Sequence, residues 1–161
     1  MMRIGVAIED TWAFFKEIYD ELCEHHTVTL FQRRVIQSPI FYERINQTVF
    51  NRDLRSFMQN NQVVFFEWAS GLLENASQLP KTCGVVTRLH RYEMYRWAEN
   101  INWDVVDKII LVSQAKRSEF VQRFPTQAEK IVVIPEAVSL ERFTSSPRSF
   151  HGDLGILCHL T

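Results

Sequence analysis

Residues 131–143 read IVVIPEAVSLERF, and the first part of this stretch decides the fold class. The run from Ile131 to Ile134 contains only branched apolar residues and is bounded by Lys130 and Pro135. A short continuous run of this kind predicts a strand covered on both faces, as in a parallel sheet. Residues that follow the carboxyl end of such a strand lie at the edge where open α/β sheets bind ligands. Glu136 is therefore a candidate site residue.

Apolar runs of the same type recur along the chain and predict five earlier strands. They are Ile4 to Ile8, Val28 to Phe31, Val63 to Phe66, Cys83 to Leu89 and Ile109 to Val112. Segments with helical spacing separate them, such as the one that contains Phe14, Ile18 and Leu22. Alternating strands and helices predict an α/β fold with a doubly wound, Rossmann-like parallel sheet, helices on both faces and right-handed crossovers.

Composition limits the classes of function. The 161 residues are enough for one core, and a hydrophobic content of 46% excludes a disordered chain. The net charge of −1 gives no reason to expect a nucleic-acid partner. The three cysteines are odd in number and far apart, and the start of the chain lacks the apolar core of a signal peptide, so we expect a cytoplasmic protein.

Polar and aromatic side chains follow the predicted strands at their carboxyl ends, where they are expected to converge. The set contains Glu9, Asp10, Glu67, Trp68, Arg88, His90, Ser113 and Glu136. His90 stands out because it leads directly into a helix, where an imidazole can donate or accept a hydrogen bond near neutral pH. A bond to a nearby backbone carbonyl is the alternative. Glu67 and Trp68 could hold a polyhydroxylated ligand through its hydroxyls and a sugar face, unless Trp68 only fills space beside its strand.

The turn after the first strand argues against a dinucleotide cofactor. Glu9 and Asp10 stand where such a sheet carries G-x-G-x-x-G, and no glycine follows Gly5 in this region. Two carboxylates would also repel a pyrophosphate. Capping of the first helix by Asp10 or Thr11 is the favoured alternative to ligand contact.

Two other signals are weak. Ser113 could bind a ligand, but no G-x-S-x-G motif surrounds it, so capping of the fifth helix is favoured and a hydrolase is not expected. His25 and His26 are adjacent and have no cysteine cluster nearby, so we expect no metal.

The connection from residue 31 to residue 59 is locally basic. It contains five arginines but only two acidic residues, Glu43 and Asp53, and aromatic residues lie between them. An amphipathic element of this kind could make weak peripheral contact with an anionic membrane. The favoured alternative is a helix that covers the sheet with its apolar side and exposes its arginines.

Three segments carry a resemblance to a known family. IPEAVSLERF resembles I-P-N-G-V-D-L-E-R-F, which closes the N-terminal domain of family 4 glycosyltransferases of the GT-B fold. KIILVSQAKRSEF is similar to the strand, serine and helix of that family, and VVTRLHRYE is similar to its strand that ends in a histidine. On this resemblance His90 matches the histidine that faces the transferred sugar, and Ser113 matches the serine after the fifth strand.

The resemblance implies a retaining, metal-independent enzyme without a cofactor that moves a sugar from a nucleotide-sugar to a glycan or lipid acceptor. It implies an acceptor-side domain over residues 1–143, a linker over 144–154 and, over 155–161, the first strand of a donor-binding domain of the same polypeptide. These 161 residues alone are then expected to be inactive.

Departures from the family pattern leave an alternative open. Glu9 to Trp12 replace the usual glycine-rich turn, and Glu136-Ala137 replace Asn-Gly, so the closing turn is expected to take another backbone path. A non-catalytic α/β binding module derived from the same fold is therefore the second interpretation.

Overall fold

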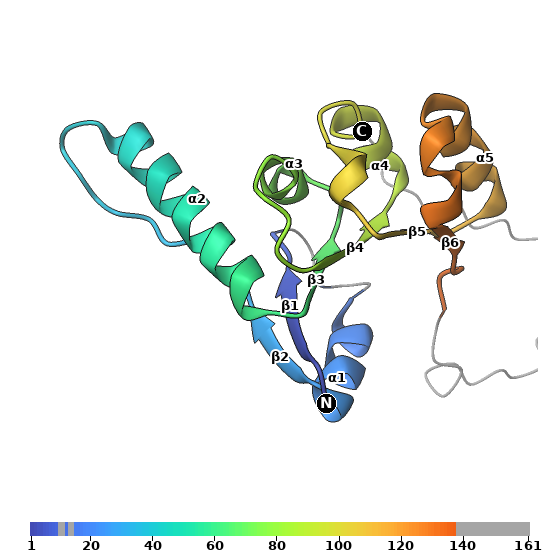
Figure 1. The fold of residues 1–161 in the computed structure, drawn as a ribbon, viewed down its shortest axis with the longest axis horizontal. Helices are drawn as coiled ribbons and strands as arrows, with labels where there is room; N and C mark the ends of the chain where they lie inside the picture. Colours follow the sequence, from blue (N-terminus) through green and yellow to red (C-terminus); the bar gives the residue numbers. More distant parts are fainter. Residues whose placement is uncertain (10–11, 13–14, 138–161) are drawn as a thin grey trace, which may run out of the picture.

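The computed structural model describes residues 1–9, 12 and 15–137. Six parallel strands form one sheet in the order β2-β1-β3-β4-β5-β6 (Figure 1). The strands are β1 (Arg3–Ala7), β2 (Thr27–Leu30), β3 (Val63–Glu67), β4 (Gly84–Leu89), β5 (Lys108–Leu111) and β6 (Ile131–Val133). The predicted doubly wound α/β sheet is confirmed, and each predicted strand agrees with the structure to within one residue at either end.

Helices cover both faces of the sheet. They are α1 (Lys16–His25), α2 (Tyr42–Asn60), α3 (Gly71–Ser77), α4 (Arg91–Arg96) and α5 (Gln114–Arg123), with the 3-10 helices η1 (Trp103–Val105) and η2 (Pro125–Lys130). Figure 1 shows α1 on one face and α2, α3, α4 and α5 on the other. The larger core lies on the second face, where Leu54 of α2, Leu72 of α3 and Phe120 of α5 are buried. The smaller core lies under α1 and contains Val6, Ile8 and Phe15.

Helix caps agree only in part with the sequence. Ser113 is the N-cap of α5, as predicted, because its hydroxyl accepts a hydrogen bond from the Lys116 N–H at 3.2 Å. The N-cap of α1 is Phe15, whose side chain makes no capping hydrogen bond. Asp10 and Thr11, the predicted caps, lie outside the described residues, as do the predicted linker at 144–154 and the strand at 155–161.

Helix α2 covers the sheet with only part of its length. Phe50, Leu54 and Met58 follow one another at intervals of four residues and are buried in the larger core. Gly5 of β1 allows the close approach, because a Cβ there would lie 2.6 Å from the Phe57 ring. Toward its amino end the helix extends beyond the sheet (Figure 1). The favoured interpretation of this segment, a sheet-covering helix, therefore holds for the carboxyl part of α2.

Candidate functional site

The centre of the site is a buried ion pair between neighbouring strands. Glu67 of β3 and Arg88 of β4 are register partners, so their side chains lie side by side on the same face of the sheet. Arg88 Nη2 donates to Glu67 Oε1 at 2.6 Å, and Arg88 Nε lies 3.0 Å and 3.1 Å from the two carboxylate oxygens. Arg88 is 6% exposed and Glu67 is 1% exposed. A pair buried this deeply needs good geometry, because each charge has lost its hydration.

His90 lies against this pair at the start of α4. Its backbone is extended at the N-cap position, which turns the chain from β4 into the helix. Nε2 lies 3.5 Å from Glu67 Oε1, and Nδ1 lies 3.8 Å from Glu136 Oε1. Within the described part of the chain, buried Nε2 makes no hydrogen bond. The imidazole is thus held between two carboxylates, and its side chain is 15% exposed.

Trp68 covers one face of the imidazole. The two ring centroids are 4.2 Å apart and the rings are inclined by 32°. Trp68 has φ of 65°, a left-handed conformation that a residue with a large side chain rarely adopts. This turn directly after β3 brings the indole beside His90. Strained backbone of this kind is often found at functional sites.

Glu136 is the most accessible charged group of the cluster. Its side chain is 40% exposed, and its Oε1 lies 3.6 Å from Arg88 Nη1. It follows β6, so five side chains from three strand ends meet at the carboxyl edge, as the sequence predicted for Glu67, His90 and Glu136. Carboxylate oxygens accept hydrogen bonds from hydroxyl groups, which makes Glu136 the group best placed to meet a polar ligand.

A groove of about 320 Å³ adjoins the cluster. The charged residues Glu17, Arg88 and Glu136 line it together with apolar side chains of α1, β3, β5 and the segment after β6, which are Ile18, Phe65, Ile110, Ile134 and Pro135. The groove therefore offers apolar walls and a few charged groups, the usual composition of a small-molecule site.

A second hollow of about 400 Å³ contains residues that the sequence analysis did not select. It lies beside the ends of the neighbouring strands β1 and β3, whose following connections lead to opposite sides of the sheet. Open α/β sheets commonly bind ligands at such a point. Glu9 lines it with Arg33, whose Nη1 is 3.9 Å from Glu9 Oε1, and Tyr92 and Arg96 line it from α4. The sequence did contain a signal for this hollow: Tyr92 and Arg96 follow His90 closely and are four residues apart, so they lie on the same side of a helix that begins at the carboxyl edge.

The predicted residues thus separate into three groups. Glu67, Trp68, Arg88, His90 and Glu136 form one cluster. Glu9 lines the second hollow, and Ser113 is occupied as a helix cap. Asp10 lies outside the described residues.

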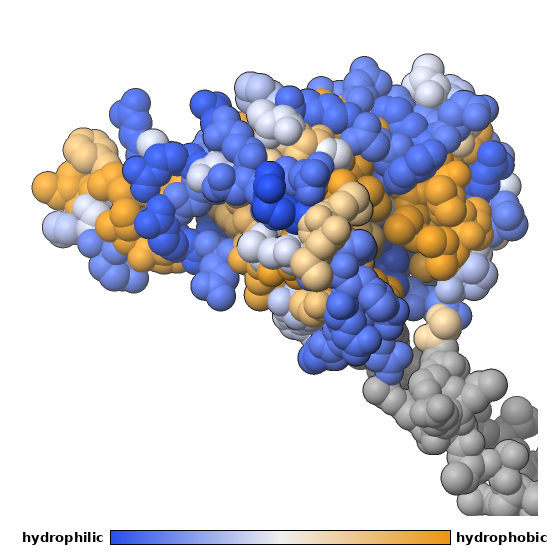
Figure 2. Space-filling view, turned by 60° about the horizontal axis from the view of Figure 1, so that its bottom comes forward, coloured by the Kyte–Doolittle hydropathy of each residue, from blue (hydrophilic) through white to orange (hydrophobic). Residues whose placement is uncertain are grey.

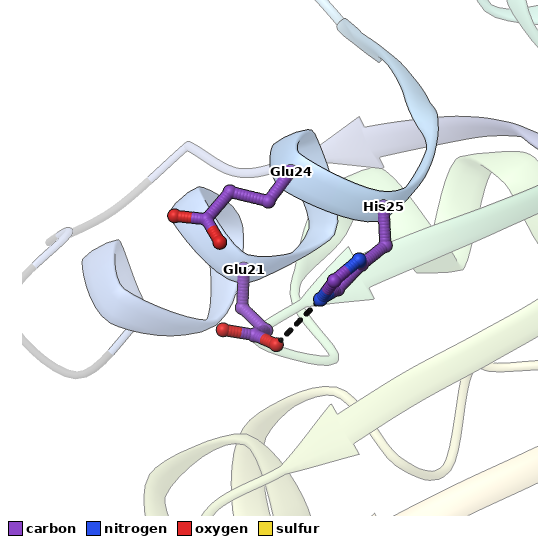
Figure 3. Close-up of side chains that lie close together, drawn as sticks. All are labelled: Glu21, Glu24 and His25. Carbon is purple, nitrogen blue, oxygen red and sulfur yellow. Dashed lines mark hydrogen bonds and ion pairs between the residues drawn. The ribbon is translucent and has the colours of Figure 1, made fainter.

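One group in the described residues has the composition of a metal site. Glu21, Glu24 and His25 lie close together on α1, and all three are exposed (Figure 3). His25 Nε2 is 3.0 Å from Glu21 Oε1, an ordinary contact between residues four apart on a helix. Exposed acidic groups on one helical turn are common, so these residues are not assigned a function.

Comparisons with known proteins identify no family for this chain. No family model matches it, and no curated protein matches it. Its function is therefore inferred from the site and from the sequence patterns.

Proposed function

We propose that this chain is the acceptor-side domain of a retaining glycosyltransferase, which moves a sugar from a nucleotide-sugar donor to a glycan or lipid acceptor. The observation that carries the proposal is the position of His90 at the carboxyl edge, between Trp68 and two carboxylates. The resemblance of the His90 segment and of the segment after β6 to family 4 glycosyltransferases supports the same reaction. In this proposal the donor is bound mainly by a second domain of the same polypeptide.

The residues of the cluster receive different roles. His90 hydrogen-bonds the transferred sugar through its Nδ1 side, because Nε2 is buried beside Glu67. Glu136 accepts a hydrogen bond from an acceptor hydroxyl, because it is the accessible carboxylate. Glu67 and Arg88 are positioning residues, since each is buried against the other. Trp68 supports the imidazole.

The groove beside the cluster suits an acceptor with both polar and apolar parts. Glu17, Arg88 and Glu136 supply its charged groups, and Phe65, Ile110 and Ile134 form apolar walls. An enzyme of this type accelerates transfer by holding both substrates in reacting geometry and by stabilising the charge that develops at the sugar. The groove and the imidazole would supply the acceptor half of that arrangement.

The test compares two histidine variants of the polypeptide encoded by the full reading frame. His90→Ala should lower sugar transfer from nucleotide-sugars by about a hundred- to a thousandfold, the range seen when a hydrogen bond to the transition state is removed. The control is His25→Ala, because His25 is exposed on α1 and does not line the groove. Circular dichroism and thermal unfolding should show both variants folded. Equal activity of His90→Ala and the parent would refute the proposal.

The second interpretation, a binding module without transfer, predicts a different result. The full reading frame would then bind a glycan, measured by calorimetry, without releasing nucleotide from any nucleotide-sugar. The transferase proposal predicts nucleotide release by the full reading frame, whereas residues 1–161 alone should show neither transfer nor tight nucleotide binding. Micromolar binding of nucleotide-sugars to these residues would place the donor site in this domain and overturn the assignment.

A further inference from the structure

Large apolar side chains gather at the projecting end of α2 and the loop before it. Five of them are solvent-exposed, and we call them the apolar tip: Val35, Ile36, Ile40, Phe41 and Tyr42. Phe41 is 71% exposed and Ile40 is 63% exposed. Figure 2 shows the hydrophobic patch at the left end of the molecule, where α2 and its loop stand away from the sheet. Large contiguous apolar patches on a protein surface commonly mark interaction sites.

The apolar tip is held in a defined shape. The Asn46 side chain, which is 8% exposed, accepts a hydrogen bond from the Ile36 N–H at 2.7 Å and donates to the Ile36 carbonyl at 3.0 Å. Arg34 Nε donates to Asp53 Oδ2 at 2.7 Å. These contacts fasten the loop to α2 at two levels. The exposed side chains are therefore presented by an ordered support and do not belong to a loose loop.

Phe41 has an unusual backbone conformation. Its φ is 57° and its ψ is 30°, at the N-cap of α2, where its side chain makes no capping hydrogen bond. A left-handed phenylalanine is strained, and glycine or asparagine would fit this position better. The conformation turns the chain from the loop into α2 while the phenyl ring remains in solvent. An exposed aromatic ring at a strained position is a reason to look for a partner.

The charge around the apolar tip indicates which partner fits. Residues 31–60 contain five arginines but only two acidic residues, whereas the chain as a whole has a net charge of −1. Arg44, Arg52 and Arg55 are exposed along α2. Arg44 lies beside the tip together with Glu43, and the other arginines lie in the loop before it and farther along α2. The tip therefore combines apolar and aromatic groups with a loop and helix that carry an excess of positive charge as a whole. A second copy of the chain would bring these positive charges against each other.

We propose that the apolar tip docks on an anionic lipid bilayer. Ile40 and Phe41 enter the interface between headgroups and acyl chains, where Tyr42 is also favoured. Arg44 lies on the first turn of α2, beside these residues, and contacts lipid phosphates. The contact is peripheral: no helix in the described part of the chain is long and apolar enough to cross the bilayer.

Vesicle co-sedimentation tests the proposal, with phosphatidylglycerol-containing and pure phosphatidylcholine vesicles. The chain should bind the anionic vesicles, bind phosphatidylcholine weakly, and lose binding as salt is added. Phe41→Gly should reduce binding about tenfold or more, because it removes the exposed ring while glycine accepts the left-handed backbone. Arg44→Gln should reduce it about fivefold, the usual effect of one arginine near an anionic surface.

Matched controls remove similar groups from another surface. Tyr95→Ser and Arg91→Gln each change an exposed residue of α4 and should leave vesicle binding unchanged. Binding that is equal for both lipids, or that survives Phe41→Gly, would overturn the proposal. Sedimentation velocity tests the other occupant. If the parent forms a dimer that Phe41→Gly dissociates, and the parent binds no vesicles, the tip would be a contact with a second copy and the proposal would be overturned.

Discussion

Two regions of the molecule break the ordinary rule of polar outside and apolar inside, and they do so in opposite directions. At the carboxyl edge of the sheet, the charged residues Glu67 and Arg88 are buried. At the end of α2, the apolar residues Ile40 and Phe41 are exposed. Buried charge and exposed apolar surface are the two informative exceptions in a folded chain. The buried ion pair positions side chains beside a groove, whereas the apolar residues at the end of α2 are presented to solvent.

The first prediction, with the largest expected effect, concerns the buried pair of Glu67 and Arg88. Arg88→Leu leaves the Glu67 carboxylate buried without its partner, so it should lower the free energy of unfolding by about 3–5 kcal/mol. Urea denaturation measures this value. The double variant Glu67→Leu/Arg88→Leu should regain most of the loss, because no buried charge is then left unpaired and Glu136 is exposed to solvent. A double variant as unstable as Arg88→Leu would show that the pair acts through packing and not through charge.

The second prediction concerns a half-exposed ion pair at the opposite, amino edge of the sheet. Asp107 accepts hydrogen bonds from Lys81 Nζ at 2.5 Å and from the Val85 N–H at 2.8 Å. Partial burial alone would raise the pKa of the Asp107 carboxyl, but these two hydrogen bonds and the positive charges of Lys81 and Lys130 together outweigh it and hold the pKa below its usual value. Because the side chain is 45% exposed, solvent screens the interaction. Asp107→Asn should therefore cost only about 1 kcal/mol of unfolding free energy at neutral pH.

The sign of the pH dependence follows from the lowered pKa. The contribution of ionised Asp107 is complete above the pKa of an unfolded aspartate, about 3.9. It is lost as the pH falls from that value through the lower pKa of the folded state. The stability difference between parent and Asp107→Asn should thus be constant near neutrality and shrink below about pH 4. A difference that grows in acid would contradict this account.

The third prediction, with the smallest expected effect, concerns the stability of the exposed apolar tip. Phe41→Gly should leave the free energy of unfolding unchanged or raise it by up to about 1 kcal/mol, because relief of left-handed strain offsets the flexibility of glycine. Thermal unfolding measures the change. Comparison with Arg88→Leu then shows that the fold depends on the buried ion pair for its stability but not on the exposed Phe41 ring. A clear loss of stability would mean that the Phe41 ring supports the loop.

The sequence predicted the strands well, because continuous runs of β-branched residues such as those in β6 have few other structural uses. It also placed Glu67, His90 and Glu136 at one edge, since parallel strands end on the same side. It could not show that Glu67 and Arg88 pair, because that contact depends on the register between β3 and β4, which the sequence pattern does not specify. The left-handed turn at Trp68 carries no glycine or asparagine, so no local signal announced it.

Helix α2 illustrates a second limit. Its apolar spacing predicts a covering helix, and Leu54 and Met58 confirm this for the carboxyl part. The pattern does not say where along the helix the sheet ends, because Phe41 and Phe50 read as similar apolar residues in the sequence. Only the geometry separates the covered residues from the exposed ones. The covering interpretation therefore holds for the carboxyl part of α2, and the proposed membrane contact concerns only its amino end.

The strand order also has a consequence for synthesis on the ribosome. Among the six strands that the structure describes, only the connection from β2 to β3 passes over a neighbour, since it crosses β1; β4, β5 and β6 each pair directly with the strand before them. Translation proceeds from the amino end at about 5–20 residues per second. Once β1, β2 and β3 have emerged, β4, β5 and β6 follow in the order in which they lie along the sheet. The partner of each of these strands has thus already left the ribosome when the strand appears, and Glu136 emerges after every other member of the cluster.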